Sequence, residues 1–363
     1  MLPDKHPLAP WLRLTLTPGL GPAAQRQLLA AFGLPECIYA AGFSAIAAVV
    51  GAPLAGKLLD HDAAAAVDLA LEWLTQPGNA ILTLGDAAYP ASLLEIPDPP
   101  VVLYVKGDVT LLSQPSIAVV GARSATPQGE ANAEAFATEL SAAGLTIVSG
   151  LALGIDGAAH RGGLSGPGRT VAVIGTGADR IYPARNAELA RRIAERGAII
   201  SEFALGIGPL AHNFPRRNRL IAGLASGVLV VEAAVKSGSL ITARLATECG
   251  REVFAIPGSI HSPLARGCHR LIRDGAKLVE SAADILEELR LSPLEAASAG
   301  DLAPVEGSPE EVRVLEAAGY DPVDVDTLVH RTSLTPEALY AILLTLELDG
   351  RVSRLPGGRI QRL

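Results

Sequence analysis

The feature that most constrains the fold is a change of periodicity near residue 80. From there to residue 279, short and continuously apolar runs alternate with segments that have helical spacing. Continuously apolar strands are typical of parallel sheets, which bury both faces under the intervening helices. The pattern predicts an α/β domain with an extended, Rossmann-like, mostly parallel sheet.

Nine apolar runs predict strands, at residues 80–84, 101–105, 117–120, 146–149, 171–174, 198–201, 228–231, 253–256 and 277–279. Six segments predict helices, at residues 127–143, 155–164, 186–196, 216–225, 239–249 and 268–274.

The two ends of the chain lack this pattern, so we expect flanking domains around a central domain at residues 79–290. Residues 1–78 predict short helices and resemble a SAM-like or helix-hairpin-helix module. Because this segment has few basic residues, we expect it to pack against the protein or contact another protein rather than to bind DNA. Residues 291–308 are rich in Ser, Pro, Ala and Gly and predict a linker. Residues 309–363 predict three helices and a glycine hairpin, the pattern of a winged helix.

The expected recognition helix of the winged helix, residues 336–349, carries three acidic residues and no Lys or Arg. Helices that read DNA normally expose basic and polar side chains. Residues 305–363 hold 6 basic against 10 acidic residues. We therefore expect this domain to contact another protein or to have a regulatory role. Contact of Arg351, Arg354 and Arg359 in the wing with phosphate is the alternative.

The composition argues against a membrane protein, a secreted protein and a metal-binding protein. The longest apolar run, residues 220–231, is too short to span a membrane, and no signal peptide is visible. Cys37, Cys249 and Cys268 are far apart and lack metal-ligand spacing. We expect a cytoplasmic protein with reduced thiols, no membrane contact, no disulfide and no metal.

Charge is distributed unevenly along this acidic chain, whose net charge is −8. Residues 120–275 hold 17 Lys and Arg against 12 Asp and Glu, whereas the remainder holds 13 against 26. An acidic body with a basic middle is what a localised anion-binding groove would produce.

Several loops that follow expected strands are rich in glycine and small polar residues. They begin at Gly121, Gly150, Gly175 and Lys236. The carboxyl ends of parallel strands meet at one edge of a sheet, and ligands bind there. We therefore expect these loops to converge on one binding groove.

The first of these loops has the most specific pattern. Thr126 is placed to cap a helix that begins at Pro127, so that backbone N–H groups and Arg123 would face the groove. The GxGxxG fingerprint and the Walker lysine are both absent, so neither NAD nor ATP is predicted and no cofactor is expected.

The stretch at residues 212–219 combines three arginines, two amides, a histidine and Phe214. Such a mixture suits phosphate contact together with base stacking. The alternative is a solvated helix start whose aromatic residue packs in the core.

A catalytic alternative rests on Asp156 and His160, which lie four residues apart on one expected helix, and on Ser149 before it. These residue types can form a triad, but the nucleophile elbow GxSxG is absent. A capping aspartate and a structural histidine are favoured, and the chain is not expected to be an enzyme.

A series of motifs resembles the DNA-processing protein A family (DprA, also called Smf). The motifs are GARSATPQG at 121–129, SGLALGIDGAAH at 149–160, VIGTGADRIYP at 173–183, ISEFALG at 200–206, FPRRNRLIAGLA at 214–225, SGSLITARLA at 237–246, VFAIPGS at 253–259 and GCHRLIRDGAKLV at 267–279. The resemblance implies an extended Rossmann domain that binds single-stranded DNA in a basic pocket without sequence specificity, dimerises through its C-terminal part, and loads RecA recombinase in natural transformation. The implied partners are single-stranded DNA, RecA, a second copy of the chain and single-strand-binding protein.

The motifs and the resemblance together predict DNA-binding residues. They are Gly121, Arg123, Ser124, Gly150, Arg185, Phe214, Arg216, Arg217, Asn218, Arg219, Ser237, Gly238 and Ser239. Phosphates would be neutralised by Arg123, Arg185, Arg217 and Arg219, and a base would stack on Phe214. The resemblance also implies a dimer interface at His269, Leu271, Ile272 and Leu278.

The chain departs from the family at two positions. Some relatives carry lysines where this chain has Ala184 and Ala211. Arg185, His212 and Arg216 are candidates to replace them, and the sequence leaves the choice open.

Two other functions compete with DNA binding. Phosphoribohydrolases of the lysine-decarboxylase-like type process nucleotides and carry a PGGxGTxxE signature. The nearest segment, residues 237–245, lacks the second glycine and has Leu245 in place of the glutamate. A pure protein scaffold would leave the clustered arginines unexplained.

Overall fold

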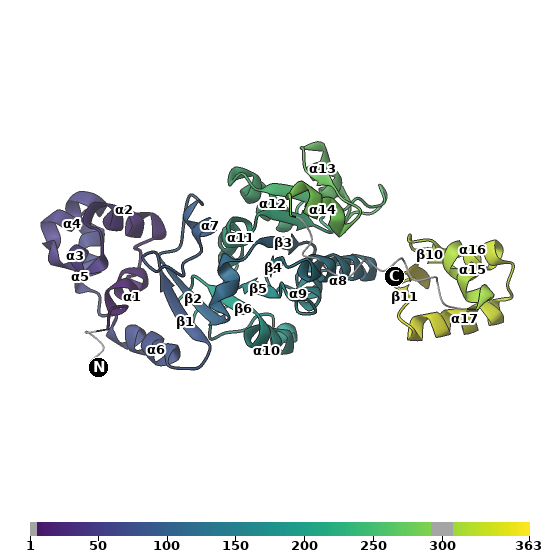
Figure 1. The fold of residues 1–363 in the computed structure, drawn as a ribbon, viewed down its shortest axis with the longest axis horizontal. Coiled ribbons are helices and arrows are strands. Elements are labelled where there is room, and N and C mark those ends of the chain that lie inside the picture. The colour runs from purple at the N-terminus through teal and green to yellow at the C-terminus, as the bar shows by residue number, and fades with distance from the viewer. Residues whose placement is uncertain (1–5, 292–307) are drawn as a thin grey trace.

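The structure, a computed structural model, describes residues 6–291 and 308–363. Figure 1 shows N-terminal helices, a central sheet covered by helices, and a small C-terminal unit. Across the described residues, no helix is both long and apolar enough to cross a membrane. The predicted linker at residues 291–308 lies almost entirely outside the described residues.

The central sheet has nine strands in the order β1-β2-β6-β5-β4-β3-β7-β8-β9. Its strands are β1 (Asn79–Thr83), β2 (Val102–Gly107), β3 (Ser116–Val120), β4 (Thr146–Ser149), β5 (Thr170–Val173), β6 (Ala198–Ser201), β7 (Gly227–Val230), β8 (Glu252–Ala255) and β9 (Lys277–Leu278). Every pairing from β6 to β9 is parallel, whereas β2 pairs antiparallel with both β6 and β1. The sheet is therefore mostly parallel with an antiparallel edge.

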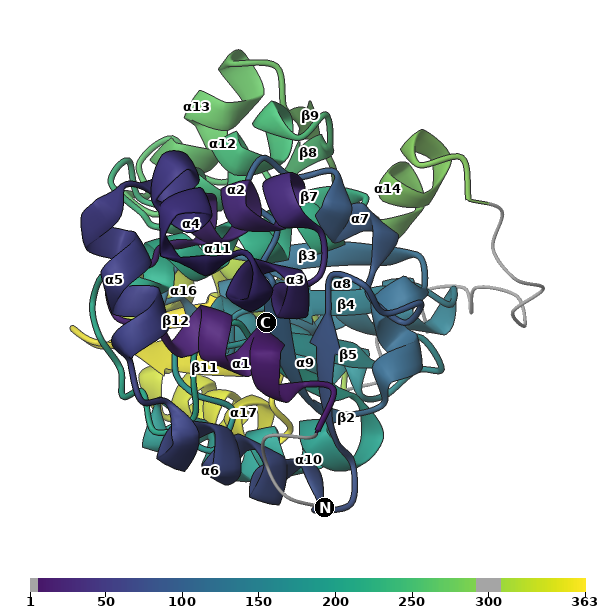
Figure 2. The same ribbon diagram turned by 90° about the vertical axis from the view of Figure 1, so that its left-hand side faces the viewer.

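The strand order reverses at β3. The chain runs outward from β3 through β4 and β5 to β6, then returns to place β7 on the other side of β3. In Figure 2 the labels β9, β8, β7, β3, β4 and β5 follow one another from top to bottom. Loops that leave β3 and β7 in opposite directions open a crevice at their carboxyl ends, where ligands of such sheets bind.

Helices cover both faces because alternate strand residues point to opposite sides. In β3, Ile117 and Val119 join one core while Ala118 and Val120 join the other. The first face carries α8 (Pro127–Ala142), α9 (Ile155–Gly163), α10 (Ala187–Arg196) and α14 (Ala282–Glu288). The second carries α11 (Asn213–Leu224), α12 (Ser239–Glu248) and α13 (Arg266–Arg273). Short helical turns at α7 (Ala91–Leu94), η2 (Val109–Ser113) and η3 (Ala184–Asn186) lie in the connections.

Six helices precede the sheet: α1 (Ala9–Leu16), α2 (Pro22–Phe32), α3 (Pro35–Ala40), α4 (Gly42–Val50), α5 (Ala52–Asp60) and α6 (Ala64–Leu74). They share one hydrophobic core with β1 and β2. Trp73 of α6, for example, packs edge-on against Tyr104 of β2, with ring centroids 5.8 Å apart. The antiparallel edge thus joins the N-terminal helices to the sheet.

The C-terminal unit has its own core, formed by residues such as Leu328 and Leu343. Its elements are α15 (Pro309–Ala318), β10 (Val323–Asp324), α16 (Val325–Thr332), α17 (Pro336–Leu348), β11 (Val352–Leu355) and β12 (Arg359–Arg362). Three helices followed by a hairpin confirm the predicted winged helix.

The predicted Rossmann-like, mostly parallel sheet is confirmed, and each predicted strand is displaced by two residues at most. One helix boundary was wrong in a way that matters for the site. The helix predicted from residue 216 begins at Asn213, so Phe214 belongs to its first turn. The predicted loop before the helix is therefore helical, and its side chains follow helical spacing.

Candidate functional site

A cavity of about 590 Å³ opens at the carboxyl ends of the strands where the strand order reverses. Its walls come from the β3–α8 loop, the β4–α9 loop, the start of α11 and the β7–α12 loop. The predicted residues that line it are Gly121, Arg123, Phe214, Arg217, Asn218, Ser237, Gly238 and Ser239. The predicted convergence of these loops on one groove agrees with this geometry.

Helix α11 divides the arginine-rich stretch into two faces. Residues three and four apart on a helix share a face, and residues two apart do not. Phe214, Arg217 and Asn218 therefore line the cavity together. Arg216 and Arg219, three residues apart, lie on another face and meet Glu202.

The ring of Phe214 is the aromatic centre of the cavity. The guanidinium carbon of Arg123 lies 5.4 Å from its ring centroid, and the Tyr182 ring lies 5.8 Å away at 47°. Gly175 stands behind the ring, where an added Cβ would approach a ring carbon to 3.0 Å. Arg123 is exposed, and it forms no ion pair with any described residue, so its charge is available to a ligand.

Arg217 is buried rather than exposed. Its Nη1 donates a hydrogen bond to the Val173 carbonyl at the end of β5 (2.8 Å), and Asp156 supplies a nearby negative charge. Burial lowers the pKa of the guanidinium to about 10. Gly150 makes this position possible, because a Cβ there would lie 1.7 Å from Nη1. Arg217 thus forms the floor of the cavity, and Gly150 supports it without lining the cavity.

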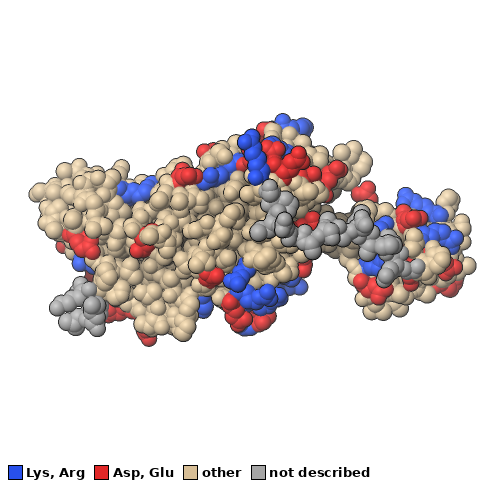
Figure 3. Space-filling model, viewed as in Figure 1, with Lys and Arg blue, Asp and Glu red and all other residues tan. Residues whose placement is uncertain are grey.

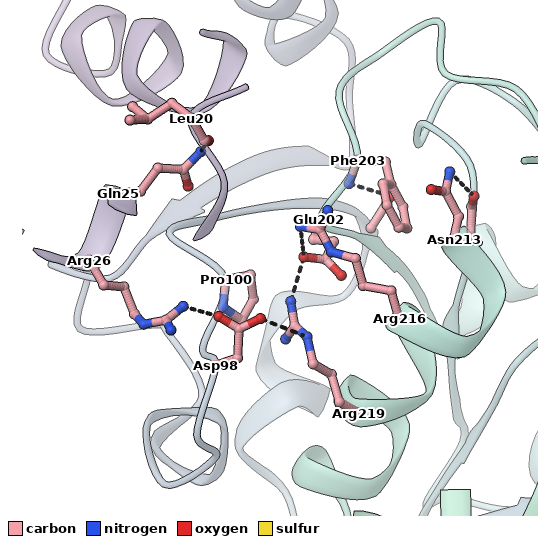
Figure 4. A network of polar contacts seen from close by, with 12 residues as sticks. Leu20, Gln25, Arg26, Asp98, Pro100, Glu202, Phe203, Asn213, Arg216 and Arg219 are labelled. Atoms are coloured by element: carbon pink, nitrogen blue, oxygen red, sulfur yellow. Dashed lines mark hydrogen bonds and ion pairs between the residues drawn. The ribbon is translucent and has the colours of Figure 1, made fainter. Parts of the chain in front are cut away.

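Arg216 and Arg219, which were also predicted to contact DNA, do not line the cavity. Both bind the carboxylate of the buried Glu202, at 2.7 and 2.5 Å. Arg219 also pairs with Asp98 at 3.4 Å, and Asp98 pairs with Arg26 of α2 (Figure 4). Glu202 and Asp98 offset two of the three positive charges of Arg26, Arg216 and Arg219, and this network connects α11 to the N-terminal helices.

The start of α8 is also occupied from within the protein. Thr126 caps the helix as predicted, since its hydroxyl accepts from Gly129 N–H. Glu232, which follows β7, accepts from Thr126 N–H at 2.9 Å and from its hydroxyl at 2.6 Å. A carboxylate therefore fills the position where free N–H groups were predicted to meet an anion.

The start of α12 remains accessible. Gly238 precedes the helix, and nothing lies within 4 Å of where its Cβ would be. The hydroxyls of Ser237 and Ser239 lie 2.7 Å apart, and Asn218 reaches the Gly238 carbonyl at 3.4 Å. One of these hydroxyls donates to the other, so the pair has one O–H left to donate to an anion at the positive end of the helix dipole.

Two further predicted residues, Ser124 and Arg185, are exposed but do not line the cavity. The three candidates to replace the family lysines, Arg185, His212 and Arg216, are all exposed, and Arg216 is also paired with Glu202. Figure 3 shows basic and acidic side chains interspersed on one face of the molecule. The described part of that face therefore carries no broad basic surface.

The three residues considered for a catalytic triad have other partners. The Ser149 hydroxyl donates to the Val119 carbonyl at 2.7 Å. Leu151 N–H donates to Nε2 of His160, so the ring proton is on Nδ1, 2.7 Å from the Thr170 hydroxyl. Burial and these bonds make His160 structural, as favoured from the sequence.

Asp156 likewise has a structural role. Its carboxylate accepts from the Ala152 N–H at 3.3 Å and helps to close the β4–α9 loop. Burial raises the pKa of this carboxyl group, against the lowering effect of the nearby Arg217.

Sequence reasoning missed two residues beside the cavity. Tyr182 lines it, and Lys236 is exposed immediately before the cavity-lining Ser237. Tyr182 lies within a quoted motif, and Lys236 begins a loop after an expected strand, so the position of each in the sequence could have indicated the site. Among the described residues, no cluster of His, Cys, Asp and Glu is arranged to hold a metal.

The predicted dimer residues lie at the β9 edge of the sheet. Leu278 in β9 is 49% exposed, and Leu271 and Ile272 of α13 are partly buried against the sheet. The His269 ring contacts the Gly258 carbonyl through Nε2 at 2.9 Å. The outer side of β9 is an edge that another chain can pair with.

Two family models match the chain. One, described as DNA recombination-mediator protein A, matches residues 80–290, and the other, described as DprA winged helix domain, matches residues 293–358. The chain is 41% identical to Protein Smf of Escherichia coli over 301 residues, which cover 81% of this chain and 80% of that protein.

Two solved structures are similar to this fold. An X-ray structure of DNA processing protein A from Streptococcus pneumoniae matches with a TM-score of 0.67 and 41% identity, over 77% of this chain and 95% of that one. DNA processing protein A from Helicobacter pylori matches with a TM-score of 0.53 and 31% identity, over 58% and 95%. The Helicobacter pylori protein is described as having a unique single-stranded DNA binding mode.

The buried His160 predicts how stability depends on pH. Burial lowers its pKa from 6.5 to about 3, so below pH 6.5 the unfolded chain binds a proton that the folded chain excludes. This residue should lower the free energy of unfolding by up to about 1.4 kcal/mol per pH unit between about pH 6 and 4. Urea unfolding of wild type and His160→Gln across this range should show the difference in their stability shrinking as the pH falls.

His261→Gln is the matched control, because His261 is exposed in a loop. A constant stability difference between wild type and His160→Gln from pH 7 to 4 would contradict the assignment.

Proposed function

The chain belongs to the DNA recombination-mediator protein A family, and we propose that it is a cytoplasmic, non-catalytic mediator that binds single-stranded DNA. It would dimerise and load RecA recombinase during natural transformation, with single-strand-binding protein as a further partner. The single-stranded DNA binding of the Helicobacter pylori relative supports the first part of this proposal. RecA loading and transformation rest on the family resemblance.

The observation that carries the proposal is the pairing of an unneutralised cation with an aromatic ring in one cavity. Arg123 and Phe214 lie together at the crevice, with the ring centroid 5.4 Å from the guanidinium carbon. A nucleotide offers a phosphate for the cation and a flat base for the ring. Grooves that bind single strands combine these two elements.

The site has the chemistry of binding without sequence preference. Phosphate contacts carry no base code, and every base has a face that can stack on a ring. Arg123 and the start of α12 would contact phosphates, while Arg185 and Lys236 are exposed on the neighbouring loops. Phe214 would contact a base.

A binding role is supported by the partners of the three residues considered for a catalytic triad. Ser149 and His160 are committed to hydrogen bonds within the sheet, and Asp156 to its own loop. The phosphoribohydrolase alternative requires a glutamate where this chain has Leu245 in α12. No observation favours it.

A dimer through β9 would place two cavities in one particle. A single DNA strand that reaches both would gain avidity, which can exceed the affinity of either site by about 10²–10⁴-fold. Short strands that reach only one cavity would gain nothing.

Replacing Phe214 tests the stacking part of the proposal. Phe214→Ala should weaken oligo-dT binding by roughly 1–3 kcal/mol, the usual range for one stacked base. Phe43→Ala, at a 49% exposed position on α4, is the control and should bind as wild type does. Fluorescence anisotropy would measure both, and unchanged affinity in Phe214→Ala would remove this ring from the site.

Replacing Arg123 tests the electrostatic part. Each phosphate contact to a single strand contributes about −0.7 to the slope of log K against log salt, so Arg123→Ala should make that slope shallower by about 0.7. Arg191→Ala is the control, because Arg191 is 64% exposed and already paired with Glu188. An unchanged slope in Arg123→Ala would exclude this guanidinium as a phosphate contact.

Replacing Leu278 tests the dimer. Leu278→Arg should yield monomers in sedimentation equilibrium, because it replaces the exposed apolar side chain of β9 with a charge. It should weaken binding of long strands while leaving short strands unaffected. Leu94→Arg, at a 52% exposed position on α7, should change neither property. A Leu278→Arg variant with wild-type mass would place the interface elsewhere.

A further inference from the structure

The ring with the most open surface at the cavity is Tyr182, which the sequence motifs did not single out. Tyr182 is 46% exposed, whereas Phe214 is partly buried and is contacted by Arg123, Gly175 and Tyr182 itself. Much of the Phe214 ring is therefore already covered by protein. Tyr182 extends the same aromatic surface outward to solvent.

The two rings are too close to hold a base between them. Their centroids lie 5.8 Å apart at an interplanar angle of 47°. Aromatic neighbours in direct contact have centroids about 4.5–7 Å apart, so the two rings already touch each other. A base that meets Tyr182 must therefore lie on its outer side, next to any base held by Phe214.

Other exposed apolar side chains lie in the same row. Those on the loops that follow β4, β5, β6, β7 and β8 are Leu153, Ile181, Tyr182, Leu210, Val235 and Ile260. These strands lie side by side in the sheet with β3 among them, so the loops leave one edge of the sheet in a line. Exposed apolar side chains on most loops of a single edge indicate a surface that is covered during function.

The charges on this edge favour a nucleic acid as the ligand. Arg123, Arg185 and Lys236 are exposed on the same set of loops, and none of them forms an ion pair within the described part of the chain. Protein interfaces are depleted of charge at their core. Unpaired cations on the same loops as an exposed ring suit a strand of phosphates and unpaired bases.

We propose that Tyr182 forms a second base-stacking subsite, next to Phe214, which takes the adjacent unpaired base of the same DNA strand. The subsite rests on the proposed function, since it needs single-stranded DNA in the cavity. Phe214 and Tyr182 then form a continuous platform for two consecutive bases. Leu153 and Leu210, beside the cavity-lining Ala152 and Ala211, extend the apolar edge on either side.

The test compares two ligands of equal charge, oligo-dT and an abasic oligomer with the same number of phosphates. Tyr182→Ala should weaken oligo-dT binding by about 5- to 150-fold and leave binding of the abasic oligomer unchanged. Tyr182→Phe keeps the ring and should bind both as wild type does. Tyr340→Ala, at a 50% exposed position on α17, is the control for loss of an exposed tyrosine.

A second readout locates the base. In Tyr182→Trp, the indole fluorescence should be quenched when oligo-dT is added and unaffected by the abasic oligomer. Equal losses for both oligomers in Tyr182→Ala would overturn the subsite and make Tyr182 a support for the cavity. Wild-type binding of both would also overturn it, and would leave the apolar row as a surface for a protein.

The outcomes separate this inference from the proposed function. If wild type binds oligo-dT and Phe214→Ala weakens it while Tyr182→Ala does not, the subsite alone is wrong. If wild type binds neither oligomer, the proposed function is wrong and the subsite is wrong with it.

Discussion

The site depends on how α11 is held against the end of β5. The buried guanidinium of Arg217 donates to the Val173 carbonyl, and Asn213 one turn earlier donates to the Gly175 carbonyl at 3.0 Å. A buried guanidinium is tolerated only with hydrogen bonds and a countercharge, which here is Asp156. Gly150 leaves the space for it. These contacts fix the start of α11 across the crevice and thereby position Phe214.

The helical spacing of α11 places neighbouring arginines on different faces of the helix. One face contributes Phe214 and Asn218 to the cavity, while Arg216 and Arg219 hold Glu202. Because Asp98 continues this network to Arg26, the N-terminal helices are connected to the same helix that lines the cavity (Figure 4). The N-terminal region therefore supports the site without entering it.

The sheet could be predicted from the sequence because buried parallel strands are apolar throughout and are separated by helices. The loops of the site could be predicted for the same reason, since each follows a strand. What could not be predicted was the direction of each side chain. Placing the start of α11 at residue 216 rather than Asn213 hid that Phe214 is helical and shares a face with Arg217 and Asn218. The contact of Glu232 with Thr126 joins residues 106 positions apart, which no local pattern reveals.

Photo-crosslinking tests the central claim most directly, that single-stranded DNA lies in the cavity at the reversal of strand order. An oligomer that contains 5-iodouracil would be crosslinked to the full-length chain, and the modified peptides identified by mass spectrometry. The account predicts crosslinks at Phe214 and Tyr182, which line the cavity from α11 and from the loop after β5. Crosslinks confined to the winged helix, with none on these loops, would contradict it.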